Sequence, residues 1–247
     1  MFFGLTNSPA TFQAMMNTIF QDLIDRGNVT IYMDDITIHT GPRKGETNKD
    51  HLACHQSLVQ QVLERLCKND LHLNPKKCTF EQDHLNFLGV HVTKGVVEME
   101  QVKVNKVKEW IQPHNVWEVH KFLGFTGYYR HFIQNYSKIA RPLLDLTKQA
   151  TPWHWEDQHR HTFKELQDRM VSKPVLRQLD FDKMFYLQTD ASKYGVGAVL
   201  SQDEGTQPTT PRKHHPVAYY SATFSPTKQN YNTHNLKFLG VIKSLNH

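Results

Sequence analysis

The stretch Val29-Thr30-Ile31-Tyr32-Met33-Asp34-Asp35-Ile36-Thr37-Ile38-His39 decides how this sequence is interpreted. Its two β-branched runs are separated only by Met33-Asp34-Asp35, which predicts a β-hairpin with both aspartates at its tip. Aspartate is a common turn residue, so the pair alone has a purely structural explanation. The functional alternative is half of a Mg²⁺ site, because Mg²⁺ prefers hard oxygen ligands and keeps positions open for substrate phosphates.

The residues around this hairpin predict a chain of mixed helices and strands. Asn7-Ser8-Pro9 predicts a helix start in which Ser8 caps and Pro9 occupies the first turn, and Gly27 predicts its end. Between them, apolar residues recur at helical spacing from Phe12 to Ile24. We expect further helices over residues 52–66, 101–112, 116–136, 156–171 and from 233 onward, and strands over 71–73, 87–92, 184–200 and 216–221.

Length and composition exclude several protein classes. The chain has 247 residues, of which 38% are hydrophobic, so it can bury a core and is not expected to be disordered. No apolar run approaches the roughly 18 residues that a membrane helix needs, and the N-terminus lacks the basic start of a signal peptide. Cys54, Cys67 and Cys78 form no CxxC motif, which is typical of reduced thiols. We therefore expect a cytoplasmic or nuclear protein with no membrane partner.

The positive charge is concentrated in the middle of the chain. The net charge is +5 overall, and residues 101–150 alone carry eight basic and three acidic side chains. Residues 116–136 interleave cations with aromatic rings, a pattern suited to nucleic acid because phosphates attract cations and bases stack on rings. A solvated helix face over an aromatic core explains the same pattern. The 16 histidines are scattered along the chain and contain no HExxH motif, although His51 and His55 have HxxxH spacing, and no histidine metal site is expected.

Further motifs occur in a fixed order along the chain. They are FGLTNSPATFQ at residues 3–13, KKCTF at 76–80, NFLGV at 86–90, FLGF at 122–125, YYRHFI at 128–133, WHW at 153–155, TDAS at 189–192 and GVGAVLSQ at 195–202. With the YMDD hairpin, this set resembles the reverse transcriptase and ribonuclease H region of a gypsy-type LTR retrotransposon polyprotein. The resemblance implies an α+β fold with a partial reverse-transcriptase palm at residues 1–92, a thumb and connection segment at 93–150, and a truncated ribonuclease H-like domain at 151–247.

The resemblance also implies roles for individual residues. Asp34 and Asp35 would be the catalytic, metal-binding acids of the polymerase site, and Asp190 the first metal ligand of ribonuclease H, with Mg²⁺ as the ion and Mn²⁺ as an alternative. The implied partners are an RNA template, a DNA primer and deoxynucleoside triphosphates (dNTPs). The implied contacts to nucleic acid or nucleotide come from Gln13, Tyr32, Met33, Lys77, Phe87, Leu88, Gly89 and Arg130.

Packing offers simpler explanations for several of these positions. Phe87 and Leu88 are core candidates first, and Lys77 has the character of an ordinary surface lysine. Gly195 and Gly197 are expected to serve strand packing rather than phosphate binding, since no helix start follows them.

Three departures from the family pattern bear on activity. The family uses a further aspartate upstream of the FGL motif, where this sequence begins, and further ribonuclease H acids would follow His247. Lys237 stands where the family has a glutamate, and a cation there repels Mg²⁺. Its ammonium either pairs with Asp190 or points to solvent. A Lys237→Glu change is expected to restore ion binding without cleavage.

The expected function is therefore that of an RNA-directed DNA polymerase with a ribonuclease H domain. This fragment is expected to be inactive alone, unless another polypeptide supplies the missing strand. The alternative is a decayed or co-opted remnant that binds nucleic acid without catalysis.

Overall fold

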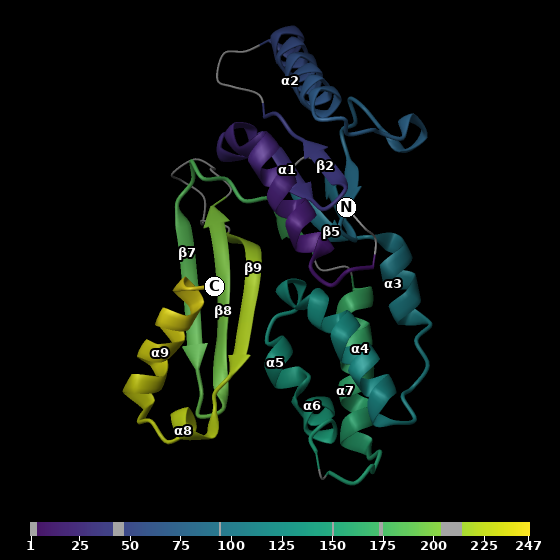
Figure 1. The fold of residues 1–247 in the computed structure, drawn as a ribbon. Helices are drawn as coiled ribbons and strands as arrows, with labels where there is room; N and C mark the ends of the chain where they lie inside the picture. The colour runs from purple at the N-terminus through teal and green to yellow at the C-terminus, as the bar shows by residue number, and fades with distance from the viewer. Residues whose placement is uncertain (1–3, 42–46, 94, 150, 173–174, 204–213) are drawn as a thin grey trace. The chain divides into compact units, whose positions relative to one another are not determined.

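The chain is organised as two compact units that divide between Glu81 and Gln82 (Figure 1). The computed structural model describes residues 4–41, 47–93, 95–149, 151–172, 175–203 and 214–247. Both units combine helices and strands, so the expected α+β class is confirmed. Among these described residues, no helix is both long and apolar enough to cross a membrane.

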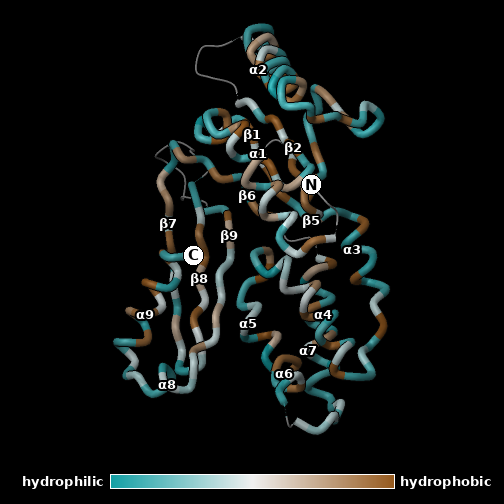
Figure 2. The backbone as a smooth tube through the Cα atoms, in the orientation of Figure 1, coloured by the Kyte–Doolittle hydropathy of each residue, from teal (hydrophilic) through white to brown (hydrophobic). Residues whose placement is uncertain are grey.

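The first unit packs two helices with a hairpin. It contains α1 (Ser8–Asp25), β1 (Val29–Tyr32), β2 (Asp35–Ile38), α2 (Asn48–Lys68) and the short 3₁₀ helix η1 (Pro75–Lys77). Figure 2 shows α2 as mainly hydrophilic with scattered hydrophobic positions, and the buried residues of this helix are Leu58, Val62 and Leu66. The core is made of apolar residues at helical and strand spacing: Met16, Phe20, Leu23, Val29, Leu58, Val62 and Leu66.

Local signals set the ends of α1, with one difference from expectation. Pro9 lies in the first turn as expected, but the N-cap is Asn7 rather than Ser8, and its side chain makes no capping hydrogen bond. Gly27 has a φ of +70°, as expected for the residue that follows a helix end. The strand expected over residues 71–73 is wrong, because the Leu71 N–H bonds the carbonyl of Leu66 at the end of α2.

The second unit begins with an antiparallel sheet in the order β3 (Leu85–Phe87), β4 (Val90–Thr93), β5 (Val96–Met99) and β6 (Leu176–Arg177). The single strand expected over residues 87–92 is instead a hairpin. Leu88 and Gly89 have φ values of +50° and +78°, and two positive φ values are the signature of a type I′ turn.

A helical segment forms the main core of the second unit. The helix expected over residues 116–136 ends at Tyr128, and Asn135 has a left-handed φ of +59° that redirects the chain. Phe122 and Phe163 meet in the core with ring centroids 4.6 Å apart. The elements are α3 (Gln101–Lys108), α4 (Val116–Tyr128), η2 (Arg130–Phe132), α5 (Tyr136–Ile139), α6 (Arg141–Leu146) and α7 (Asp157–Val171).

This helical core includes residues from both sides of residue 151, where the ribonuclease H-like domain was expected to begin. Its buried members run from Met99 to Leu176 and include Leu166 and Met170 of α7. The helix α7 therefore packs with the preceding helices, and β6 pairs with β5. The division into palm, connection and ribonuclease H-like parts stays a prediction about function.

A three-stranded antiparallel sheet follows, formed by β7 (Phe185–Ala191), β8 (Gly195–Asp203) and β9 (His214–Thr223). The helices α8 (Pro226–Gln229) and α9 (Thr233–Leu245) end the chain, and α9 runs beside β7 in Figure 1. One face of the sheet packs on α9, where a side chain at Gly240 would meet Ala191 and Val196 at 3.2 and 3.1 Å.

The expected packing role of Gly195 and Gly197 is confirmed. A Cβ at Gly195 would lie 2.5 Å from the carbonyl oxygen of Ala222, and one at Gly197 would lie 2.6 Å from Oδ1 of Asn135. The backbone oxygen beside Gly195 leaves no room for a side chain, and a side chain at Gly197 would require the Asn135 amide to move, so the two glycines permit close contacts on β8.

Candidate functional site

The YMDD sequence forms the end of the β1–β2 hairpin, but its two aspartates lie in different backbone settings. Tyr32 pairs with Asp35, so the loop is the two-residue Met33-Asp34 and Asp35 belongs to β2. The expected three-residue tip is therefore wrong by one residue. Met33 has a φ of +56° while Asp34 does not have a positive φ, which is the pattern of a type II′ turn.

Both carboxylates are free to bind a cation. Asp34 and Asp35 are exposed, and neither carboxylate has a hydrogen bond or ion pair in the described part of the chain. Two adjacent, unneutralised carboxylates suit the hard oxygen shell of Mg²⁺ or Mn²⁺. Within the same described residues, no third His, Cys, Asp or Glu joins them in a group that could hold a metal ion. The chemistry of the donor pair fits a divalent ion, with the remaining positions left to other ligands.

The other residues expected near this site differ in their surroundings. Gln13 of α1 hydrogen-bonds the hairpin backbone, accepting from the Met33 N–H at 2.6 Å. The Tyr32 ring is 55% exposed, which leaves it available to a ligand. Lys77 lies at the end of η1 and is exposed, so its expected contact with a triphosphate stays a prediction.

Two tyrosines hold the Leu88-Gly89 turn, the segment expected to grip a primer. The Tyr128 hydroxyl donates to the Leu88 carbonyl at 2.5 Å, and the Tyr129 hydroxyl donates to the Gly89 carbonyl at 3.1 Å. Phe87, just before the turn, is half-buried. No role for the two tyrosines is predicted from the sequence, although their adjacency in the YYRHFI motif is the signal that could have indicated one.

Arg130 is engaged inside the second unit. Its guanidinium donates to the Ser221 carbonyl of β9 and, at 3.1 Å, to the Ser137 hydroxyl. Ser137 in turn donates its N–H to the Ser221 hydroxyl at 3.0 Å and its own hydroxyl to the Ser221 carbonyl at 2.8 Å. These bonds join the helical segment to the sheet, so the observed role of Arg130 is structural and its contact with nucleic acid stays a prediction.

Asp190 and Lys237 do not lie on the same face of the second sheet. Asp190 pairs with Gly197, which pairs with Ser221, and this row faces Asn135 and Ser137 of the helical segment. The neighbouring row packs on α9, because successive strand residues point to opposite faces. Lys237 is exposed on α9, and no ion pair joins it to Asp190 among the described residues. Of the two expectations for Lys237, the solvent-facing one is confirmed.

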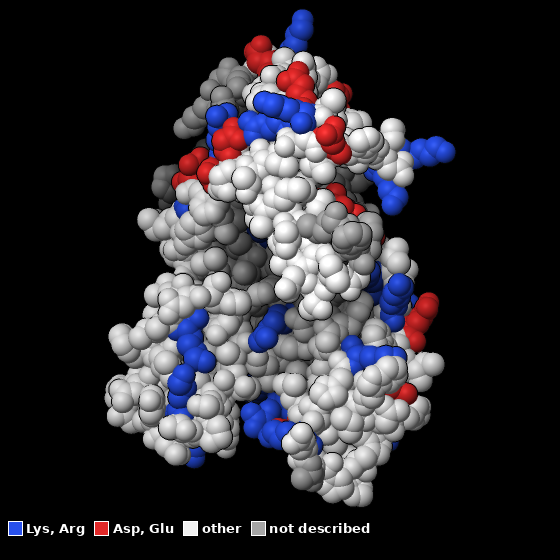
Figure 3. Space-filling model, viewed as in Figure 1, with Lys and Arg blue, Asp and Glu red and all other residues white. Residues whose placement is uncertain are grey.

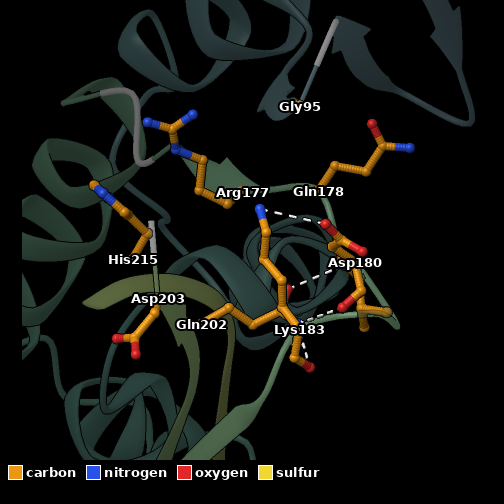
Figure 4. Close-up of a pocket in the computed structure, with 9 residues that line it drawn as sticks. Gly95, Arg177, Gln178, Asp180, Lys183, Gln202, Asp203 and His215 are labelled. Atoms are coloured by element: carbon orange, nitrogen blue, oxygen red, sulfur yellow. Dashed lines mark hydrogen bonds and ion pairs between the residues drawn. The ribbon is translucent and has the colours of Figure 1, made fainter. Parts of the chain in front are cut away.

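A polar pocket of about 380 Å³ was not anticipated from the sequence. Figure 4 shows Lys183 reaching toward Asp180, an ion pair of 3.3 Å, beside Gln202, whose amide bonds the backbone of Asp180. These groups satisfy one another, and the lining includes none of the predicted site residues. The lining residues are Gly95, Arg177, Gln178, Leu179, Asp180, Lys183, Gln202, Asp203 and His215.

Comparison with known proteins accounts for both ends of the chain. Residues 1–92 match the family model of reverse transcriptase (RNA-dependent DNA polymerase), and residues 155–247 match that of the RNase H-like domain found in reverse transcriptase. The Tf2-3 and Tf2-4 transposon polyproteins of Schizosaccharomyces pombe are each 37% identical over 245 residues, which is 99% of this chain. The chain thus matches two parts of reverse transcriptase and is similar to retrotransposon polyproteins. It spans 17% of the length of those two relatives.

Solved structures of reverse transcriptases share this fold. The foamy viral protease-reverse transcriptase in complex with an RNA/DNA hybrid has a TM-score of 0.78 at 23% identity, over 99% of this chain and 31% of that one. Its dRH form in complex with double-stranded DNA has a TM-score of 0.77 at 22% identity, over 98% of this chain and 40% of that one. The expected fold is thus confirmed by these solved structures.

Proposed function

We propose that this chain contributes the palm hairpin and a nucleic-acid-binding surface to RNA-directed DNA synthesis. The observation that carries the proposal is the pair of exposed, unneutralised carboxylates of Asp34 and Asp35 at the end of a hairpin. Their place in the ordered reverse transcriptase motifs supports the same activity.

The residues at the hairpin suit this chemistry. A divalent ion held by Asp34 and Asp35 would activate a primer hydroxyl and stabilise the charge on a departing pyrophosphate. The two-residue turn restricts where the carboxylates can point, which favours a fixed arrangement of ion and substrate. The exposed Tyr32 ring beside them offers a surface on which a base or sugar of the primer end can pack.

Five lysines of residues 101–150 supply a surface for phosphates. Figure 3 shows basic side chains on the surface over the α3–α4 region. Arg141 and Lys148 both pair with the Asp145 carboxylate, at 2.9 and 2.6 Å. The lysines of this segment that form no ion pair within the described chain are Lys103, Lys106, Lys108, Lys121 and Lys138. The proposed partners are therefore an RNA template with a DNA primer, bound through their phosphates.

The metal proposal is tested by titrating Mn²⁺ into the chain and measuring water proton relaxation. The Asp34→Asn/Asp35→Asn variant is expected to lose this binding, since it removes both anionic ligands. Asp70→Asn is the matched control, because Asp70 is exposed in the same unit and its left-handed backbone, φ +53°, suits asparagine. Equal Mn²⁺ affinity in the wild type and the double variant would refute the site.

The nucleic-acid proposal is tested by fluorescence anisotropy with a labelled RNA–DNA hybrid at several salt concentrations. The slope of log affinity against log salt concentration is expected to become shallower by roughly 1.5 in Lys106→Gln/Lys108→Gln, because two phosphate contacts are lost. Lys148→Gln is the control within the same segment, because Asp145 already holds that ammonium. Affinity independent of salt would contradict phosphate binding.

Binding without catalysis is the second candidate function. It is favoured by the described residues placing only two carboxylates together at the hairpin. Primer extension on an RNA template separates the candidates: extension abolished by Asp34→Asn/Asp35→Asn supports polymerase chemistry. Hybrid binding with no extension in either protein supports the second candidate.

A further inference from the structure

The side-chain amide of Gln13 bonds the YMDD backbone on both sides of Tyr32. Its Oε1 accepts a hydrogen bond from the Met33 N–H at 2.6 Å, and its Nε2 donates to the Ile31 carbonyl at 3.2 Å. A peptide group of a neighbouring strand presents the same acceptor and donor. The amide of Gln13 thus continues the hydrogen bonding of β1 at its outer edge, up to the first residue of the turn.

Met33 needs such support. Its φ of +56° is a conformation that non-glycine residues adopt with strain and keep only where neighbours hold it. The 2.6 Å bond from Gln13 satisfies the Met33 N–H in that conformation. A change at Gln13 therefore acts first on the backbone that carries Asp34.

The base of this clamp is rigid. Phe12, beside Gln13, packs against the core of the first unit together with Ile31 and Ile36 of the hairpin. The Gln13 Nε2 also donates to Oδ1 of Asn17, one turn further along α1, at 2.8 Å. Both polar atoms of the amide are thereby oriented, and the helix and hairpin that it joins share one core.

We propose that Gln13 is a positioning residue that holds Met33 in its left-handed conformation, so that Asp34 and Asp35 present their carboxylates together. The inference rests on the proposed metal-binding function of that pair. It assigns Gln13 a role different from the template and nucleotide contact implied by family resemblance, because the hairpin and Asn17 engage its amide.

The clamp is tested directly by hydrogen exchange of the Met33 amide, followed by NMR on the full chain. Gln13→Leu is expected to speed this exchange about tenfold or more, because the N–H loses its acceptor. Gln21→Leu is the matched control on α1, since among the described residues the Gln21 amide bonds only the Asp25 carboxylate of the same helix, at 2.8 Å. Unchanged exchange at Met33 in Gln13→Leu would overturn the clamp.

A second variant keeps the test valid if Gln13→Leu does not fold. Gln13→Glu retains an acceptor for the Met33 N–H and loses the donor to the Ile31 carbonyl. The exchange rate of the Met33 amide in Gln13→Glu is expected to lie between the rate in the wild type and the rate in a chain without the clamp. Exchange as slow as in the wild type would refute the contribution of the Ile31 bond.

Mn²⁺ affinity tests the positioning role itself. Gln13→Leu is expected to weaken Mn²⁺ binding about three- to tenfold, with Gln21→Leu unchanged. In a Met33→Gly background, Gln13→Leu is expected to weaken Mn²⁺ affinity about twofold or less, because glycine adopts a positive φ without strain. Equal losses in both backgrounds would show that Gln13 does not act through Met33, and unchanged affinity despite faster exchange would likewise overturn positioning.

The two proposals fail in distinguishable ways. A wild-type chain that binds no Mn²⁺ refutes the proposed metal site, and with it the positioning role. Faster Met33 exchange in Gln13→Leu would still establish the clamp in that case. A chain that binds Mn²⁺ through Asp34 and Asp35 but shows unchanged Met33 exchange refutes the clamp alone.

Discussion

The Tyr129 hydroxyl donates a hydrogen bond to the Gly89 carbonyl across 40 residues of sequence, at 3.1 Å. Burial, reinforced by the nearby Tyr128 and Glu100, raises the pKa of Tyr129 to about 12. The phenol therefore remains a donor well beyond neutral pH. The NFLGV turn and the YYRHFI motif, which the sequence presents as separate signatures, form one structural feature.

Gly89→Ala is expected to lower the free energy of unfolding by about 2–4 kcal/mol, measured by urea denaturation. Gly89 has a φ of +78°, and an added Cβ would lie 2.6 Å from the Tyr129 hydroxyl oxygen. Gly95→Ala is the matched control: its φ is +76° with no atom within 4 Å, so only the backbone cost of about 1–2 kcal/mol applies. Equal losses in the two variants would contradict the clash with Tyr129.

Tyr129→Phe provides a further check on the same contact. Alone it is expected to cost about 1 kcal/mol for the lost hydrogen bond. In that background Gly89→Ala should cost less than in the wild type, because the oxygen that the Cβ meets has gone. Additive losses in a double-mutant cycle would disprove this coupling.

Arg130→Met is expected to destabilise the second unit by roughly 2 kcal/mol or more, since charged hydrogen bonds to Ser137 and Ser221 are lost. Arg141→Met is the control, because that arginine is partly exposed and, within the described part of the chain, pairs only with Asp145, an interaction worth about 1 kcal/mol or less. Thermal unfolding of both variants makes the comparison. Similar losses would mean that the Arg130 bonds contribute little to joining helix and sheet.

The Asp22–Arg65 ion pair predicts a specific acid sensitivity of the first unit. The hydrogen bond from Arg65, 2.8 Å at Asp22 Oδ2, lowers the pKa of Asp22 from 3.8 to about 2. Since the folded pKa lies below the unfolded one, this stabilisation is complete above pH 3.8 and is lost as pH falls toward 2. Asp22→Asn should reduce the acid dependence of unfolding in that range, and Asp25→Asn is the neighbouring control. An unchanged profile in Asp22→Asn would contradict this.

Lys237→Glu is expected to leave Mg²⁺-dependent thermal stability unchanged. The glutamate would stand on α9, and Asp190 lies on the opposite face of the sheet, in the row of Gly197 and Ser221. The ion binding expected from sequence alignment alone is thus revised. A Mg²⁺-dependent rise in melting temperature that appears in Lys237→Glu and disappears on adding Asp190→Asn would show that the two side chains meet.

Local sequence patterns were reliable where the structure depends on near neighbours. The β-branched runs around Met33-Asp34 predicted the hairpin, and the three- and four-residue spacing after Pro9 predicted α1. Boundaries were less accurate, because an unusual backbone conformation at one residue changes an element. Leu88 and Gly89 turn an expected strand into a hairpin, and the helix expected to reach residue 136 ends at Tyr128, ahead of the left-handed Asn135.

The sequence by itself determined the α+β class, the family resemblance and the position of the aspartate pair, since these follow from motifs and periodicities within short segments. Only the tertiary structure decided that Gln13 holds Met33, that Tyr129 holds Gly89, and that Asp190 faces away from Lys237. Such contacts join distant residues through packing and strand register. A shift of one residue in register moves a side chain to the other face of a sheet, and periodicity along the chain does not specify which distant partner it then meets.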